Sequence, residues 1–245
     1  MCDLCLSRRR FLTVVPLAAT VSACDVSLVS DAEAERMGLA AWRDMTAQKP
    51  LSSNGEYAEV VARVAGRLLR AAGHAPGEWE FAVFADRSAN AFALPGRKIG
   101  IHEGMMRLTA TEDQLAAVIG HEIGHIDAEH SKERMSAQAA SGWGVRVVAW
   151  LLNWGEMEYA EEIAAALGLG VEVGILRPYG RDQEEEADAL GVRFMAEADF
   201  DPQGAIELWR LMEAAQGARG PEFLSTHPAP RSRIRNLEAV IESLA

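Results

Sequence analysis

The stretch 118–130, VIGHEIGHIDAEH, holds three histidines and three carboxylates within what otherwise reads as an amphipathic helix. Side chains four residues apart lie on one face of a helix, about 6 Å apart along its axis. His121 and His125 can therefore share one ion, and their spacing fits two ligands of a tetrahedral Zn²⁺. Glu122 is rotated by about 100° around the helix, so its side chain can approach a water molecule on the metal without being a ligand.

This H-E-x-x-H pattern predicts hydrolytic chemistry, in which the metal acidifies water and the glutamate takes its proton, but it needs a third ligand. His130 lies nine residues after His121, half a turn out of phase, and is expected to face away from the ion if the helix stays straight. Glu129 lies about 12 Å along the axis from His121, too far to share the ion. The longer metzincin pattern fails because Ala128 and Ser131 occupy its glycine and third-histidine positions. The third ligand must therefore come from elsewhere in the chain.

The best source of a third ligand is the acidic stretch 182–188, DQEEEAD, at the start of a predicted helix, where the helix dipole favours carboxylates. Glu184 and Asp188 are four apart and share a face. One carboxylate can therefore bind the metal while the other accepts the second N–H of a ligand histidine. By charge alone, Glu184, Glu185 and Glu186 are equivalent candidates for the ligand. Without the histidines, such a cluster would more often be a solvated helix start.

The rest of the pattern predicts an α+β fold that is mainly helical, with a small sheet beside the H-E-x-x-H helix. Helices are expected over residues 31–70 with a break near 48–55, from Thr111 toward Gln138, and over 182–198, 202–215 and 231–244. Residues 79–84 and 98–102 alternate as half-buried strands do, with a turn at 90–96 between them. In the stretch 141–177, Trp143, Trp150 and Trp154 would share one helix face, for which a buried core position is favoured over a membrane or substrate surface.

Residues 1–23 are predicted to be a signal peptide, because a basic SRRRFL stretch leads into a run of 13 uncharged, mostly apolar residues. The run ends in VSAC, which resembles the lipobox of bacterial lipoproteins, so Cys24 is expected to become a diacylated membrane anchor. The arginines also resemble a twin-arginine export signal, with ordinary Sec export as the alternative. Both routes lead to the periplasmic side of the cell envelope, and Asp25 slightly favours the inner membrane. Cys2 and Cys5 would be removed with the signal.

The composition of the 245-residue chain is globular, with 49% apolar and 24% charged residues and a formal charge of -12. Outside the first ten residues there is no long run of Lys and Arg, which argues against nucleic acid as a partner. Any large partner is therefore expected to be a protein.

Four separate motifs carry a resemblance to known peptidases. H-E-I-G-H followed by E-x-x-x-D resembles the gluzincin metallopeptidases. Four stretches in the same order resemble the family of HtpX, the CAAX prenyl proteases and BepA: NAFALPG at 90–96, HEIGH at 121–125 with His130 after it, EEEAD at 184–188, and STHPAPR at 225–231. The resemblance implies a zincin-like metallopeptidase domain over residues 51–245, after an N-terminal helix and linker at 24–50.

The resemblance also implies roles for residues of the site. It implies one Zn²⁺ on His121, His125 and Glu184, Glu122 as the catalytic base, and Asp188 as the carboxylate behind a ligand. Because no apolar span longer than about 20 residues follows the predicted signal, the multi-spanning branches of the family are not expected. The small periplasmic, lipoprotein-like branch remains.

Two further motifs gain a meaning from the same resemblance. In zincins an edge strand beside the metal helix binds the substrate as an added strand, and residues 90–101 are placed to be that strand. Its candidate contacts are Asn90, Ala91, Phe92, Pro95 and Gly96. Arg97 stands where many relatives have a second glycine, a departure that affects the turn or the substrate preference. His227 has three open roles: a hydrogen bond to the oxyanion, occupancy of the metal's fourth position in a latent state, or entry into a helix without any chemistry.

The sequence therefore predicts a lipid-anchored, zinc-dependent endopeptidase of the cell envelope that hydrolyses misfolded or unassembled proteins. The rival is a non-catalytic envelope chaperone or assembly lipoprotein, with zinc as a structural staple and residues 141–177 as its client-binding surface. Arg231 and Arg235, four apart near the C-terminus, are expected to pair with acidic surface rather than with substrate.

Overall fold

The computed structural model describes residues 29–136, 180–215, 221–227 and 231–244. The predicted signal peptide, Cys24, Asp25 and the tryptophan face within 141–177 lie outside these residues. In the described part of the chain, no helix is both long enough and apolar enough to cross a membrane.

Helices dominate the fold and a small sheet accompanies them, so the prediction of a mainly helical α+β, zincin-like architecture is confirmed. In chain order the elements are α1 (Asp31–Gln48), α2 (Gly55–Ala71), η1 (Pro76–Glu78), β1 (Glu80–Phe84), β2 (Ala91–Leu94), β3 (Lys98–His102), α3 (Glu103–Leu108), α4 (Glu112–Asp127), α7 (Arg181–Glu197), α8 (Gln203–Ala214), α9 (Phe223–Thr226) and α10 (Arg231–Leu244).

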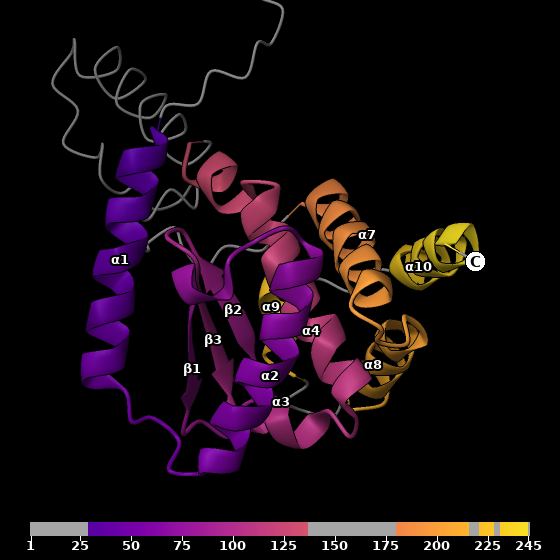
Figure 1. Cartoon of the computed structure of the whole chain (residues 1–245), viewed down its shortest axis with the longest axis horizontal. Coiled ribbons are helices and arrows are strands. Elements are labelled where there is room, and N and C mark those ends of the chain that lie inside the picture. Colours follow the sequence, from indigo (N-terminus) through magenta and orange to yellow (C-terminus); the bar gives the residue numbers. More distant parts are fainter. Residues whose placement is uncertain (1–28, 137–179, 216–220, 228–230, 245) are drawn as a thin grey trace, which may run out of the picture.

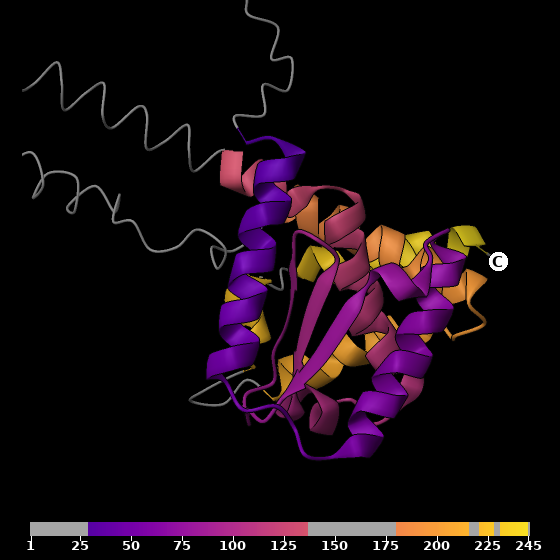
Figure 2. The same ribbon diagram turned by 60° about the vertical axis from the view of Figure 1, so that its left-hand side comes forward.

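The sheet has the strand order β1-β3-β2, with β1 parallel and β2 antiparallel to β3. Alternate residues of a strand point to opposite faces, and here both faces are covered. Val83 and Ile99 belong to the main core with residues of α2 and α4, whereas Phe84 and Leu94 pack against Trp42 of α1 in a separate cluster. The sheet therefore lies between α1 on one side and α2 and α4 on the other (Figures 1 and 2).

The turn between β2 and β3 contains two consecutive residues with positive φ, Gly96 at 87° and Arg97 at 61°. This left-handed conformation costs a residue with a Cβ about 1–2 kcal/mol. An ion pair between Arg97 and Glu78 accompanies it on the exposed side of the turn. The residue that departs from the family's second glycine thus adopts the backbone conformation that glycine favours.

The central helix α4 is buried without interruption from Gln114 to His125. The Thr111 side chain caps its N-terminus by accepting a hydrogen bond from the Gln114 N–H. The Gln114 side-chain oxygen reaches back past Thr111 and accepts from the Ala110 N–H.

The prediction that this helix continues toward Gln138 is wrong at one point. α4 ends at Asp127, Glu129 has a φ of 55°, and helical structure resumes at residue 130. A left-handed residue turns the chain, so the rotation of 100° per residue cannot be carried across Glu129.

The contact between α4 and α7 is made through residues without bulky side chains. A Cβ on Gly124 would lie 2.8 Å from the Ala187 carbonyl oxygen, and a Cβ on Gly191 would lie 3.0 Å from the Gly120 carbonyl carbon. Real Cβ atoms essentially never show the first distance, and the second is tighter than nine in ten real Cβ contacts. The two helices therefore approach more closely than larger residues would allow.

Gly124→Ala is expected to lower the free energy of unfolding by about 1–3 kcal/mol, because the added methyl group would overpack this contact. Gly66→Ala in α2 is the matched control. Its nearest heavy atom outside the helix backbone is a side-chain nitrogen of Arg70 at 3.5 Å, so it should raise stability by up to about 1 kcal/mol. Urea unfolding in the presence of a chelator measures both. If both substitutions changed the free energy of unfolding by the same amount and in the same direction, the close contact between α4 and α7 would be contradicted.

Candidate active site

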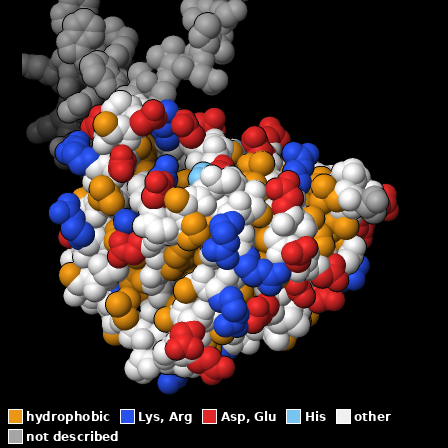
Figure 3. Space-filling view, viewed as in Figure 1, with side chains coloured by type: hydrophobic (Ala, Val, Ile, Leu, Met, Phe, Trp, Pro, Cys, Tyr) orange, Lys and Arg blue, Asp and Glu red, His pale blue; other side chains and the backbone are white. Residues whose placement is uncertain are grey.

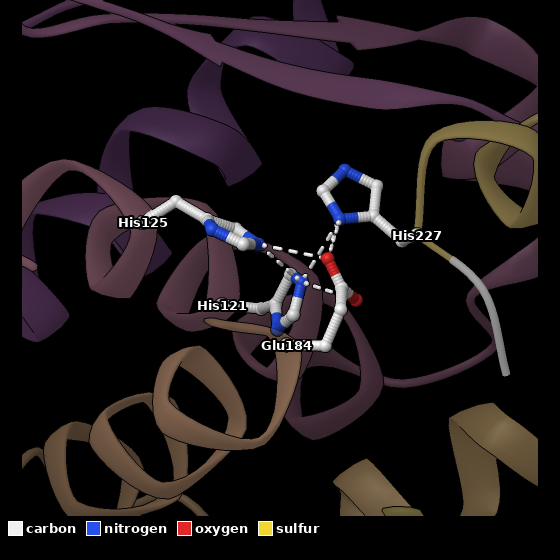
Figure 4. Close-up of side chains that lie close together, drawn as sticks. All are labelled: His121, His125, Glu184 and His227. Atoms are coloured by element: carbon white, nitrogen blue, oxygen red, sulfur yellow. Dashed lines mark hydrogen bonds and ion pairs between the residues drawn. The ribbon is translucent and has the colours of Figure 1, made fainter. Parts of the chain in front are cut away.

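Four potential metal ligands meet where α4, α7 and the end of α9 come together. His121 and His125 project from α4, Glu184 from the first turn of α7, and His227 follows α9 directly. One donor atom of each lies within 4.8 Å of the others, and all four residues are buried. Figure 4 shows the four side chains converging on one point from these elements.

The distances between the donor atoms fit a tetrahedral ion. His121 Nε2 lies 3.0 Å from His125 Nε2 and 3.2 Å from His227 Nδ1. Glu184 Oε1 lies 3.3 Å from His125 Nε2 and 2.9 Å from His227 Nδ1. Donors that each stand about 2.1 Å from a tetrahedral ion are about 3.4 Å from one another. Three imidazole nitrogens and a carboxylate oxygen are also the donor types that bind divalent first-row metals.

The three glutamates that the sequence could not rank are separated by the structure. Glu184 joins the histidines, whereas Glu185 Oε1 lies 3.3 Å from the Ser232 hydroxyl and Glu186 Oε2 lies 3.3 Å from His130 Nε2. Burial would raise the pKa of Glu184, but hydrogen bonds with His125 and His227 outweigh it and hold that pKa well below its usual range. Glu184 is therefore ionised and available as a ligand.

Asp188 lies directly behind His121, with its Oδ1 2.9 Å from His121 Nδ1. A carboxylate in this place accepts the Nδ1–H and leaves Nε2 facing the other donors. The four-residue spacing of Glu184 and Asp188 thus brings both carboxylates to the same histidine, since His121 Nε2 is also 3.6 Å from Glu184 Oε2.

Arg233 of α10 binds both of these carboxylates. Its Nε and Nη2 each donate to Asp188 at 2.7 Å, its Nη1 donates to Glu184, and its guanidinium lies 3.9 Å from the centre of the Trp209 ring. Only 1% of the residue is exposed. Burial would raise the pKa of Asp188, but the charge of Arg233 and the hydrogen bond to His121 hold it below its usual value.

Arg233 is not among the predicted site residues, and the sequence pattern drew attention only to its neighbours Arg231 and Arg235. Helical phase could have identified it, because Arg233 stands four residues before the buried Leu237 and so shares its face. Arg235 is exposed.

Glu122 lies beside the four donors and is fully buried. Within the described structure neither of its carboxylate oxygens accepts a hydrogen bond, and His227 Nε2 lies 3.4 Å from Oε1. Burial raises the pKa of Glu122 because the charged form is desolvated. A carboxylate with a raised pKa and free acceptor positions is suited to take a proton.

His227 contacts both halves of the site. Its Nδ1 stands with the three other donors and its Nε2 faces Glu122. Its ring stacks on Phe223 with centroids 4.3 Å apart, and Phe223 is itself in the main core. Of the three roles that the sequence left open, this position corresponds to the fourth ligand position.

The expectation that His130 faces away from the ion assumed a straight helix, and that assumption is wrong. The left-handed Glu129 turns the chain so that His130 Nδ1 lies 3.0 Å from Nδ1 of His125, on the side opposite the metal donors. His130 is 1% exposed. It does not join the four donors, but it contacts one of the residues that do.

Of the predicted substrate segment 90–101, residues 91–94 form β2, an edge strand of the described sheet, Pro95 and Gly96 lie in the turn after it, and residues 98–101 belong to the central strand β3. β2 packs against α4. Ala91 is 0% exposed and Ala93 4%, so this edge is not open to solvent. At its start, the Ala89 carbonyl oxygen accepts a hydrogen bond from the Phe223 N–H at 3.0 Å. The buried Asn90 lies there too, with its Nδ2 3.4 Å from Glu222 Oε1. The segment that carries His227 therefore docks on the first residues of the strand.

Arg233→Leu is expected to destabilise the protein by about 3–5 kcal/mol, because it leaves the buried carboxylates of Asp188 and Glu184 without their cation. The exposed Arg235→Leu is the control and should change stability by less than about 0.5 kcal/mol. Denaturant unfolding of both variants, with a chelator present, provides the measurement. A mild effect of Arg233→Leu, equal to that of the control, would contradict this account of the buried network.

Comparison with known proteins identifies the family. The model of peptidase family M48 matches residues 52–241. The mitochondrial metalloendopeptidase OMA1 of Schizosaccharomyces pombe is 34% identical over 232 residues, which is 93% of this chain and 66% of that protein. The beta-barrel assembly-enhancing protease of Escherichia coli is 27% identical over 213 residues, 85% of this chain and 44% of that protein.

The chain thus spans two thirds or less of the length of these relatives. The family model begins after α1, and the four donors and Glu122 lie within the residues that it matches. The resemblance to gluzincin metallopeptidases is confirmed by the match, and the chain belongs to peptidase family M48.

Proposed function

We propose that this protein is a zinc-dependent endopeptidase of the bacterial cell envelope that hydrolyses misfolded or unassembled proteins. The observation that carries the proposal is the set of His121, His125 and Glu184 donors beside the buried, unbonded carboxylate of Glu122. The family match and the protease relatives support the same chemistry.

Zinc is the proposed metal, since two imidazoles and one carboxylate are the protein ligands of many catalytic zinc sites. When bound, zinc would polarise the scissile carbonyl and lower the pKa of a water molecule. His121 and His125 would hold it through Nε2, because Asp188 and His130 contact their Nδ1 atoms.

Glu122 takes the proton of the attacking water and returns it to the leaving amine. Its raised pKa makes it a stronger base than an ordinary surface carboxylate. Its burial excludes bulk water, which would otherwise compete for the carboxylate.

His227 is proposed to close the site in a resting conformation. Its Nδ1 fills the fourth donor position and its Nε2 faces the base, so both places that an attacking water needs are occupied by one side chain. The covered edge of β2 and the docked Phe223 fit the same resting conformation. Substrate entry would then require residues 221–227 to move.

The substrate is proposed to bind in extended form along β2, which favours unfolded over folded protein. A groove of about 580 Å³ continues beyond the end of this strand, with Gly96, Arg97, Ile126 and Lys132 among its lining residues and Asp31 and Leu39 contributed by α1. This volume is in the range of binding sites for ligands of several residues or rings.

The envelope location and the membrane anchor remain proposals that rest on the N-terminal sequence. They consist of export by a twin-arginine or Sec signal, an acylated Cys24, and retention at the inner membrane through Asp25. The relatives are described as a mitochondrial metalloendopeptidase and a protease that enhances beta-barrel assembly. Misfolded or unassembled envelope proteins are the substrate class that fits the proposed location.

One observation favours the second candidate, a non-catalytic chaperone in which zinc only stabilises the fold. Four protein donors close the site, as they do in structural zinc sites, whereas catalytic sites keep one position open. A structural site gives no reason for a buried carboxylate without hydrogen bonds beside the metal, however, because such a group costs stability. Two variants distinguish the candidates.

Glu122→Gln should retain zinc but cleave an unfolded model protein at least about 100-fold more slowly than the wild-type chain, because the general base is lost. Zinc content and cleavage rate are measured on the same preparation. Glu213→Gln, at an exposed position of α8, is the control and should cleave normally. Undiminished cleavage by the zinc-loaded Glu122→Gln protein would refute the catalytic assignment.

His227→Ala should raise the cleavage rate of unfolded protein by about tenfold if the closed conformation is populated about ten to one. Thr226→Ala, one residue earlier, should leave the rate within a factor of two. If the site is only a staple, His227→Ala instead loses zinc and stability and gains no activity. Rates and zinc content of the two variants decide between these results.

A further inference from the structure

His130 and His125 are joined by a contact that the helix alone could not produce. α4 ends at Asp127, and Glu129 adopts a φ of 55°, which a residue with a Cβ rarely does. Backbone conformations of this kind are strained and collect at functional sites. Here the result is that His130 Nδ1 lies 3.0 Å from His125 Nδ1, with both rings buried.

The positions of the two rings determine where their protons must be. His125 Nε2 faces Glu184 at 3.3 Å and His121 at 3.0 Å, so it is the nitrogen that meets the metal and carries no hydrogen. The proton of His125 is therefore on Nδ1, which must donate it. The described atom closest to it in His130 is Nδ1 at 3.0 Å, and we take that atom as the acceptor of the hydrogen bond.

The same reasoning extends to the next residue. If Nδ1 of a neutral His130 accepts, its proton is on Nε2, and that nitrogen lies 3.3 Å from Glu186 Oε2. An ionised carboxylate has no N–H or O–H to donate, so it can only accept this hydrogen bond. Both hydrogen bonds therefore donate outward, from His125 to His130 and from His130 to Glu186.

We propose that His130, held by Glu186, is a positioning residue that fixes the tautomer and ring orientation of the metal ligand His125. This inference rests on the metal site of the proposed function and assigns a role to two residues outside it. The two ligand histidines of α4 are then supported in different ways. His121 has the buried Asp188 directly behind it, whereas His125 is reached through an imidazole from Glu186, whose side chain is 62% exposed.

The test uses two substitutions of His130 in the full chain. His130→Leu removes the acceptor, whereas His130→Asn keeps a side-chain oxygen close to the position of Nδ1. Zinc affinity is measured by competition with a chromophoric chelator. His130→Leu is expected to bind zinc 10- to 100-fold more weakly than wild type, the usual cost of losing the partner of a ligand histidine, and His130→Asn should recover most of that loss.

Two further readouts separate positioning from a merely structural role. The visible absorption of the Co²⁺-substituted protein reports ligand geometry and should change in His130→Leu but not in His130→Asn. Urea unfolding of the metal-free variants reports stability alone. Unchanged zinc affinity and an unchanged cobalt spectrum in His130→Leu would overturn the proposal. So would a loss of metal-free stability that accounts for the whole loss of affinity.

Glu186→Ala and its neighbour Glu185→Ala give a second comparison that decides the matter even if His130→Leu does not fold. Glu186→Ala should weaken zinc binding more than Glu185→Ala, which contacts Ser232 instead. Equal zinc affinities of the two variants would overturn the proposed role of His130 and Glu186. Absence of stoichiometric zinc in the wild-type chain would refute the metal site itself, so the two failures are distinguishable.

Discussion

The close contact between α4 and α7 is the constraint on which the site depends. A coordination shell is only a few ångströms across, so helices that carry its ligands must approach within the length of a histidine or glutamate side chain. Gly120 and Gly124 on one helix meet Ala187 and Gly191 on the other with no room for a further methyl group. The same sequence segments therefore supply both the ligands and the small residues between them, and the packing cannot loosen without separating the donors.

Charge balance explains why so polar a centre can exist inside the core. Among the described residues, the carboxylates of Glu122, Glu184 and Asp188 are buried here, and the buried guanidinium of Arg233 pairs with the last two. Unpaired buried charges are costly, so a divalent cation at the four donors would balance negative charge that Arg233 leaves. Arg233 compensates part of this charge whether or not a metal is bound. The position of α10 is thereby coupled to the ligand helix α7.

The parts of the site that lie within one helix could be predicted from sequence, because the regular rise and rotation per residue fix which side chains share a face over one or two turns. It paired His121 with His125 and placed Asp188 on the face of Glu184. It failed for His130, where one left-handed residue changed the phase, and a single sequence rarely reveals such a residue when it is not glycine. Contacts between distant elements, such as those of Arg233, depend on how helices pack, and periodicity states only which face is buried.

The packing of α1 against the rest of the fold limits how far the active site could lie from a lipid on Cys24. Its first residue, Asp31, is paired with Lys132, Gly38 touches the Pro95 backbone too closely to carry a Cβ, and Trp42 is buried against the sheet. Cys24 precedes Asp31 by seven residues, a length of chain that spans at most about 25 Å. A lipid on that cysteine would therefore hold the folded part of the chain close to the membrane surface. Polypeptide at that surface could then reach the site, whereas polypeptide elsewhere in the compartment would first have to diffuse to the membrane.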